Sequence, residues 1–182
     1  TLFRLWDRLV GPVIPLEMEG IEIDPLVASL GPRYFGLRGD EAKVRIGDGR
    51  VVLAASGERY DLIVVDAYSN QLYIPFQLTT REFFMEAQAH LRPGGILALN
   101  VNSVDDQAPL LEAMKATLAS VFPHTYVAKV RGPYNYLLGG AEDPVDLRGL
   151  GEEVKAMALS SPSEEMRSSA HELYQVALEL EH

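Results

Sequence analysis

Cysteine is absent from this chain of 182 residues. Without thiols, neither disulfides nor thiolate metal sites can form, and nothing in the composition indicates an oxidising compartment. The four histidines lie far apart and lack the spacing of a zinc site, so no metal is expected. A chain of this length can bury one substantial hydrophobic core, and the fold has to depend on that core.

Long apolar runs are also lacking. No stretch approaches the roughly 18 residues of a membrane-spanning helix, and the first residues do not follow the pattern of a signal peptide. We therefore expect a cytoplasmic protein with no membrane partner. Basic residues are few, with 16 Lys and Arg against 26 Asp and Glu. Because contacts with phosphates need clustered positive charge, nucleic acid is not expected as a partner either.

Apolar runs alternate with amphipathic segments along the chain. We predict strands at residues 18–23, 43–47, 60–66 and 96–101, and helices at residues 2–10, 25–34, 49–56, 79–91, 109–120 and 163–178. Apolar strands separated by helices are typical of a parallel sheet with helices on both faces. Residues 124–130 and 134–140 are close enough to form an antiparallel hairpin at the sheet edge. The prediction is a Rossmann-like, doubly wound α/β fold.

The two ends of the sequence bear on its domain organisation. The chain opens at Thr1, already inside a helical pattern, so we expect the natural protein to extend further upstream. Residues 180–182 match the remnant of a purification tag. We expect residues 1–179 to form a single domain that is incomplete at its amino terminus.

Three acidic residues stand at the ends of predicted strands: Glu22, Asp48 and Asp66. In open α/β sheets, ligands bind beyond the carboxyl ends of the strands. One carboxylate there can accept from both ribose hydroxyls, and a second can accept from an exocyclic amine. Local explanations also exist, because Asp48 could cap a helix and Asp66 could anchor its own loop. Three acids at successive strand ends favour a nucleoside cleft, with Glu22 for the ribose and Asp48 for the adenine.

Four stretches of the sequence together resemble the spermidine synthase family, within the class I S-adenosylmethionine-dependent methyltransferase fold. They read GIEIDPLVASLGPRYFGL, VRIGDGRVVL, YDLIVVDAY and IPFQLTTREFFMEAQAHLRPGGILALNV, between about residues 19 and 101. The resemblance implies a seven-stranded sheet whose last strand is antiparallel. It also implies that the first strand and a glycine-rich loop, which in the family precede the first helix, are missing from this sequence.

The resemblance further implies a transferase of polyamine biosynthesis. Its co-substrate would be S-adenosylmethionine or decarboxylated S-adenosylmethionine, and an amine would accept the aminopropyl group. Glu22 would hold the ribose, Asp48 with Gly49 would face the adenine, and Asp66 would be the catalytic residue beside the sulfonium. By analogy with the family, a homodimer is expected.

The loop after the third predicted strand departs from the family pattern. The family carries an Asp, two small residues and a second Asp that contacts the amine, whereas this chain has Ser69 at the position of that second acid. A serine hydroxyl is a poor base without an activating partner. The predicted substrate loop contains Tyr68, Ser69, Asn70, Gln71 and Tyr73. Its aromatic residues could form a lid over a ligand, or they could simply pack the loop against the sheet.

Three alternative functions are compatible with this sequence. The leading hypothesis is aminopropyl transfer from decarboxylated S-adenosylmethionine to an amine. One alternative is methyl transfer from S-adenosylmethionine to a small or macromolecular acceptor. The other is a non-catalytic relative that binds a nucleoside, which the missing acid at Ser69 favours.

Overall fold

The computed structural model describes residues 17–39, 42–68, 74–129, 134–146, 148–149, 152–153 and 155–156. The predicted helices at residues 2–10 and 163–178 and the proposed tag remnant lie outside these ranges. Contacts between Cα atoms divide the chain into two compact units, Thr1–Ser56 and Gly57–His182. Each unit is described by itself, and the single domain stays a prediction.

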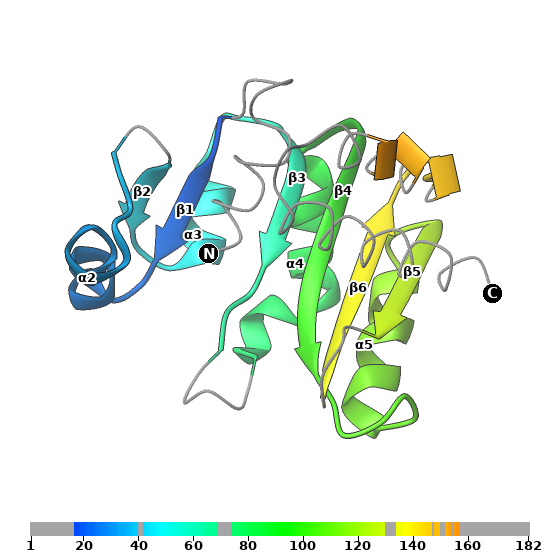
Figure 1. Ribbon diagram of the computed structural model, residues 1–182. Helices are drawn as coiled ribbons and strands as arrows, with labels where there is room; N and C mark the ends of the chain where they lie inside the picture. The colour runs from blue at the N-terminus through cyan, green and yellow to red at the C-terminus, as the bar shows by residue number, and fades with distance from the viewer. Residues whose placement is uncertain are drawn as a thin grey trace. The chain divides into compact units, whose positions relative to one another are not determined.

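The first unit contains a small parallel sheet and two helices (Figure 1). Its elements are β1 (Glu19–Glu22), α2 (Pro25–Phe35), β2 (Lys43–Ile46) and α3 (Gly49–Ala54). The Asp24 carboxylate accepts a hydrogen bond from the Leu26 backbone nitrogen at 2.8 Å and so caps α2. Gly36 ends α2 in the left-handed conformation, with φ of 60°. The four elements predicted for this part of the sequence are confirmed.

The second unit contains a four-stranded sheet in the order β3-β4-β6-β5. The strands are β3 (Tyr60–Val65), β4 (Leu91–Asn102), β5 (His124–Lys129) and β6 (Asn135–Ala141). β3 and β4 are parallel, whereas β6 pairs antiparallel with both β4 and β5. The predicted edge hairpin is therefore confirmed, and β6 is its inner strand.

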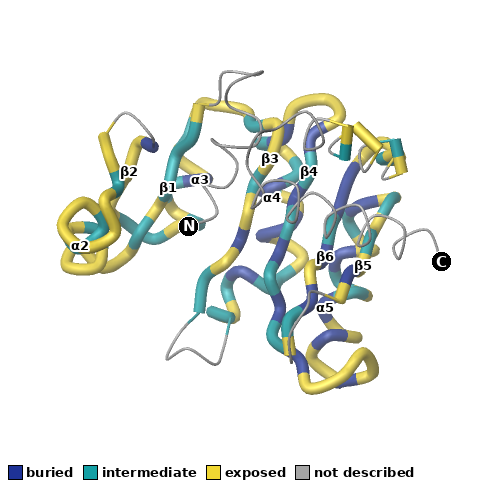
Figure 2. Tube along the Cα trace, viewed as in Figure 1, coloured by how far each residue is buried: buried dark blue, intermediate teal, exposed yellow. Residues whose placement is uncertain are grey.

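Helices cover one face of this sheet. The connections from β3 to β4 and from β4 to β5 contain η1 (Phe76–Leu78), α4 (Arg81–Ala89) and α5 (Pro109–Ala119). Thr80 caps α4 by accepting a hydrogen bond from the Phe83 backbone nitrogen at 3.2 Å. Figure 1 shows α4 and α5 behind the strands, and Figure 2 shows buried residues along both the strands and these helices.

The core of the second unit depends on the alternation of side chains along β4. Leu97, Leu99 and Val101 are each 0 % exposed, and helix side chains pack over that face of the sheet. The buried helix residues are Phe83, Phe84, Ala87, Leu111, Met114 and Leu118. Because successive side chains of a strand point to opposite faces, Asn100 points away from this core.

β4 begins earlier than the predicted residue 96. Tyr60 pairs with Leu91 but Leu62 pairs with Ile96, so the chain bulges between these two pairs. Pro93 and Gly94 belong to this irregularity, and Gly94 has φ of 78°. The prediction of the start was wrong because apolar periodicity does not show that Leu91 pairs beyond the bulge.

Gly95 allows the backbone to approach closely at this bulge. A Cβ atom there would lie 2.9 Å from the Arg92 carbonyl oxygen and 3.0 Å from the Tyr60 carbonyl oxygen. We expect Gly95→Ala to lower the free energy of unfolding in urea by about 1–3 kcal/mol, because backbone atoms cannot rotate aside. Gly57→Ala is the matched control, since nothing lies within 4 Å of its Cβ position. Equal unfolding midpoints for the two variants would contradict this account of Gly95.

Candidate functional site

Two of the predicted carboxylates lie where the parallel strands of the first unit end. Glu22 is the last residue of β1 and pairs with Ile46, the last residue of β2. Asp48 follows β2 and directly precedes α3, with Gly49 as the first residue of that helix. Both carboxylates are partly exposed. The structure therefore places Glu22, Asp48 and Gly49 at the carboxyl ends of adjacent parallel strands.

Both carboxylates hold the local backbone with one oxygen only. Glu22 Oε1 accepts from the Asp24 backbone nitrogen at 2.9 Å. Asp48 Oδ1 accepts from the backbone nitrogens of Arg50 and Val51, at 2.9 and 3.2 Å. Asp48 therefore caps α3, which is the local role that the sequence offers as an alternative to ligand binding. Within the described residues, Glu22 Oε2 and Asp48 Oδ2 have no hydrogen-bond partner, so capping and ligand binding are compatible.

Asp66 follows β3 in the second unit and is exposed. Its Oδ1 atom accepts a hydrogen bond from Asn100 Nδ2 at 2.9 Å. Val65 pairs with Leu99, so the parallel register brings Asp66 alongside Asn100. Its Oδ2 atom has no hydrogen-bond partner in the part of the chain that the structure describes. Within the described residues, Asp66 is therefore held by the neighbouring strand β4.

Tyr68 is also bound to β4. Its hydroxyl donates to the Asn100 carbonyl oxygen at 2.8 Å. Burial raises the pKa of this hydroxyl above its ordinary value, and the Asp66 carboxylate raises it further, whereas a hydrogen bond with the Asn102 backbone acts the other way. The phenol therefore keeps its proton, and its role as donor, into the alkaline range.

The raised pKa of Tyr68 predicts a change in alkaline stability. In the unfolded chain tyrosine ionises near pH 10.0, and in the folded protein above that pH. Its contribution to stability is therefore complete below pH 10 and is lost as pH rises from there through the folded pKa. We expect the free energy of unfolding to fall less steeply above pH 10 in Tyr68→Phe than in the wild type. Urea unfolding at successive pH values measures this, and parallel curves would contradict it.

Other parts of the predicted site are not described by the structure. Ser69, Asn70, Gln71 and Tyr73 lie outside the described residues. Asp66 belongs to a different unit from Glu22 and Asp48, so a cleft common to all three stays a prediction. Among the described residues, no group of His, Asp and Glu is arranged to hold a metal ion, and no helix is long and apolar enough to cross a membrane.

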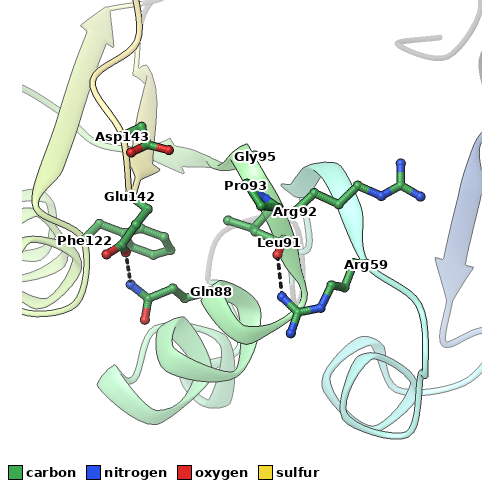
Figure 3. Close-up of a pocket in the computed structure, with 9 residues that line it drawn as sticks. All are labelled: Arg59, Gln88, Leu91, Arg92, Pro93, Gly95, Phe122, Glu142 and Asp143. Carbon is green, nitrogen blue, oxygen red and sulfur yellow. Dashed lines mark hydrogen bonds between the residues drawn. The ribbon is translucent and has the colours of Figure 1, made fainter.

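A cavity of about 330 Å³ lies at the end of the second unit's sheet where β3 and β4 begin, away from Asp66. Figure 3 shows it near the starts of β3 and β4, with Arg59 and Arg92 opposite Glu142. Gln88 Nε2 donates to Glu142 Oε2 at 2.7 Å, and Arg59 Nη1 donates to a backbone carbonyl oxygen at 3.1 Å. None of the predicted site residues that the structure describes lines this cavity, and Gln88 and Arg59 already have these partners within the protein.

Asn100 is the residue near Asp66 that sequence reasoning missed. The apolar run at residues 96–101 predicts a strand and gives no role to Asn100. One signal in the sequence is that Asn100 is a polar amide between two apolar residues of the strand. Because side chains alternate between the two faces of a sheet, it points away from the core. That signal alone does not identify its partner, because the pairing depends on the register of two strands that are far apart in sequence.

Comparisons of the sequence with known proteins find several relatives of this chain. Residues 17–138 match the model of the spermine/spermidine synthase domain. The chain is 38 % identical over 160 residues to a probable polyamine aminopropyl transferase of Bifidobacterium longum, covering 86 % of this chain and 34 % of that protein. It is 30 % identical over 133 residues to the human eEF1A lysine and N-terminal methyltransferase, covering 66 % of this chain and 19 % of that protein.

A solved structure establishes the fold class. Human methyltransferase-like protein 13, in complex with SAH, matches with a TM-score of 0.64 and 23 % identity, over 94 % of this chain and 76 % of that one. The predicted class I methyltransferase-like fold is confirmed. The chain spans about a third of the length of the Bifidobacterium relative.

Proposed function

This chain belongs to the spermine/spermidine synthase family, and on that premise we propose that it binds S-adenosylmethionine or its decarboxylated form and transfers an aminopropyl group to an amine. The Bifidobacterium relative, whose name gives polyamine aminopropyl transfer as its probable activity, supports this choice of reaction. Glu22, Asp48 with Gly49, and Asp66 would line one donor cleft.

The three carboxylates share the two features that support this proposal most directly. Each follows or ends a parallel strand at its carboxyl end, and each uses only one of its two oxygens within the described residues. A carboxylate oxygen without a partner can accept from ribose hydroxyls or from an adenine amine. A carboxylate is also attracted to a sulfonium cation.

The proposed reaction is a displacement at carbon. The acceptor nitrogen attacks the aminopropyl carbon bonded to sulfur, a C–N bond forms, and the C–S bond breaks to release methylthioadenosine. The nitrogen loses one proton, which Asp66 Oδ2 is available to accept. Correct positioning of the two substrates would supply most of the rate enhancement, because no covalent intermediate with the protein is needed.

Ser69 bears on the charge of the acceptor amine. Ser69 replaces the second acid of the family pattern, which contacts the amine, so the loop offers hydrogen bonds in place of charge. We propose that the acceptor carries less positive charge than a diamine that is protonated at both ends. The protein would act as a homodimer by analogy with its family.

Calorimetry with methylthioadenosine tests the binding part of the proposal, and mass spectrometry of product amines tests the transfer. We expect saturable binding, and aminopropylated product with decarboxylated S-adenosylmethionine as donor. An absence of methylthioadenosine binding would overturn the donor site. Binding without product, across monoamines and diamines of different length, would support the non-catalytic alternative.

Methyl transfer is the second candidate function. The similarity to a human protein lysine methyltransferase favours it, because that relative is aligned over two thirds of this chain. Methyl transfer predicts tighter binding of S-adenosylmethionine than of its decarboxylated form, and methylated acceptor in place of aminopropylated acceptor. The same two assays with both donors separate these reactions.

A further inference from the structure

Asn100 contacts both functional groups that follow β3. Its side-chain amide donates to Asp66 Oδ1 at 2.9 Å, and its backbone carbonyl oxygen accepts from the Tyr68 hydroxyl at 2.8 Å. These contacts join the strand to the start of the loop at two points. The loop therefore leaves β3 with Asp66 in a fixed orientation.

Asn100 itself stands on a rigid part of the sheet. It is flanked by Leu99 and Val101, both 0 % exposed, and it pairs with Leu137 of β6. β4 is also paired with β3 on its other side. Side chains on well-packed strands hold their geometry more precisely than side chains on loops.

Local stability does not require this amide–carboxylate hydrogen bond. Asp66 is exposed, so water can satisfy its carboxylate when no protein donor is present. An exposed hydrogen bond of this kind adds little to the free energy of folding. Its main physical effect is to limit the rotation of the Asp66 side chain.

We propose that Asn100 is a positioning residue for the transfer reaction. It binds Oδ1 of Asp66 and leaves Oδ2 as the oxygen that accepts the proton from the attacking amine. The amide is neutral, so it fixes the carboxylate without placing a competing positive charge beside the sulfonium. This inference rests on the proposed function, because it assigns a role only if Asp66 acts on the acceptor.

The test replaces Asn100 with Leu, a side chain of similar size without a donor. We expect kcat to fall about tenfold to a hundredfold, the effect of losing one hydrogen bond to a charged group. The affinity for methylthioadenosine should change less than about twofold, because Asn100 acts through Asp66 rather than on the donor. Asn100→Gln keeps the amide and should retain more activity than Asn100→Leu.

Gln88→Leu is the matched control. Gln88 makes the same kind of amide–carboxylate bond, to Glu142 at 2.7 Å, at the opposite edge of the same sheet. We expect wild-type kcat for this variant. Thermal unfolding of both variants separates a loss of fold from a loss of positioning.

A double-mutant cycle with Asp66→Asn decides whether Asn100 acts through Asp66. If it does, Asn100→Leu lowers kcat tenfold or more in the wild-type background and less than about twofold in Asp66→Asn. The inference would be overturned if Asn100→Leu lowered kcat by the same factor in both backgrounds. It would also be overturned if Asn100→Leu were folded and had wild-type kcat. Failure of the wild-type protein to transfer or to bind methylthioadenosine would instead refute the proposed function.

Discussion

Asp66→Asn is expected to reduce kcat for aminopropyl transfer by about 10²–10⁴, the usual contribution of a positioned general base. The substitution is isosteric and keeps an acceptor for the Asn100 amide, which now donates to Asp66 Oδ1 at 2.9 Å. It removes the negative charge and the proton acceptor. Initial rates with saturating donor and acceptor measure the effect.

Asp61→Asn is the control for this prediction. Asp61 lies on the same strand and is exposed, and its Oδ2 atom accepts from Arg92 Nη1 at 2.7 Å. An exposed ion pair of this kind contributes little to stability, so kcat should stay within about twofold of the wild type. If Asp66→Asn also retained wild-type kcat, Asp66 would have no role in proton transfer.

Glu22→Gln is expected to weaken methylthioadenosine binding by about tenfold to a hundredfold. The neutral amide accepts hydrogen bonds from ribose hydroxyls less strongly than a carboxylate does. The substitution preserves an oxygen for the Asp24 backbone nitrogen, which now donates to Glu22 Oε1 at 2.9 Å. Titration calorimetry of the two proteins at one ionic strength measures the change.

Asp24→Asn is the matched control for Glu22→Gln. Asp24 is two residues away and caps α2, a role that Asn performs about equally well. We expect unchanged affinity for methylthioadenosine. Equal affinities for wild type and Glu22→Gln would exclude Glu22 from the ribose site, whereas a loss in both variants would indicate damage to this part of the first unit.

The sequence predicts most of the described elements because local signals mark them. Asp24 before Pro25 and Thr80 before Arg81 are helix caps whose effect extends over only a few residues. The strand from Ile96 onward likewise follows from a continuous apolar run. Elements that depend on such short-range signals need no knowledge of the rest of the fold.

Features that depend on pairing between distant segments were not predictable. The bulge between Tyr60 and Leu62 arises from the register of β3 with β4. The contact between Asp66 and Asn100 depends on the same register. In the candidate site, the strand-end positions of Glu22 and Asp48 follow from the sequence, whereas the hydrogen bond that orients Asp66 requires the structure.

A crystal structure of the protein with methylthioadenosine tests the central claim most directly. The account predicts the ribose hydroxyls on Glu22, the adenine beside Asp48 and Gly49, and the sulfur atom next to Asp66. A nucleoside bound away from these residues, for example in the cavity lined by Arg59 and Phe122, would contradict it.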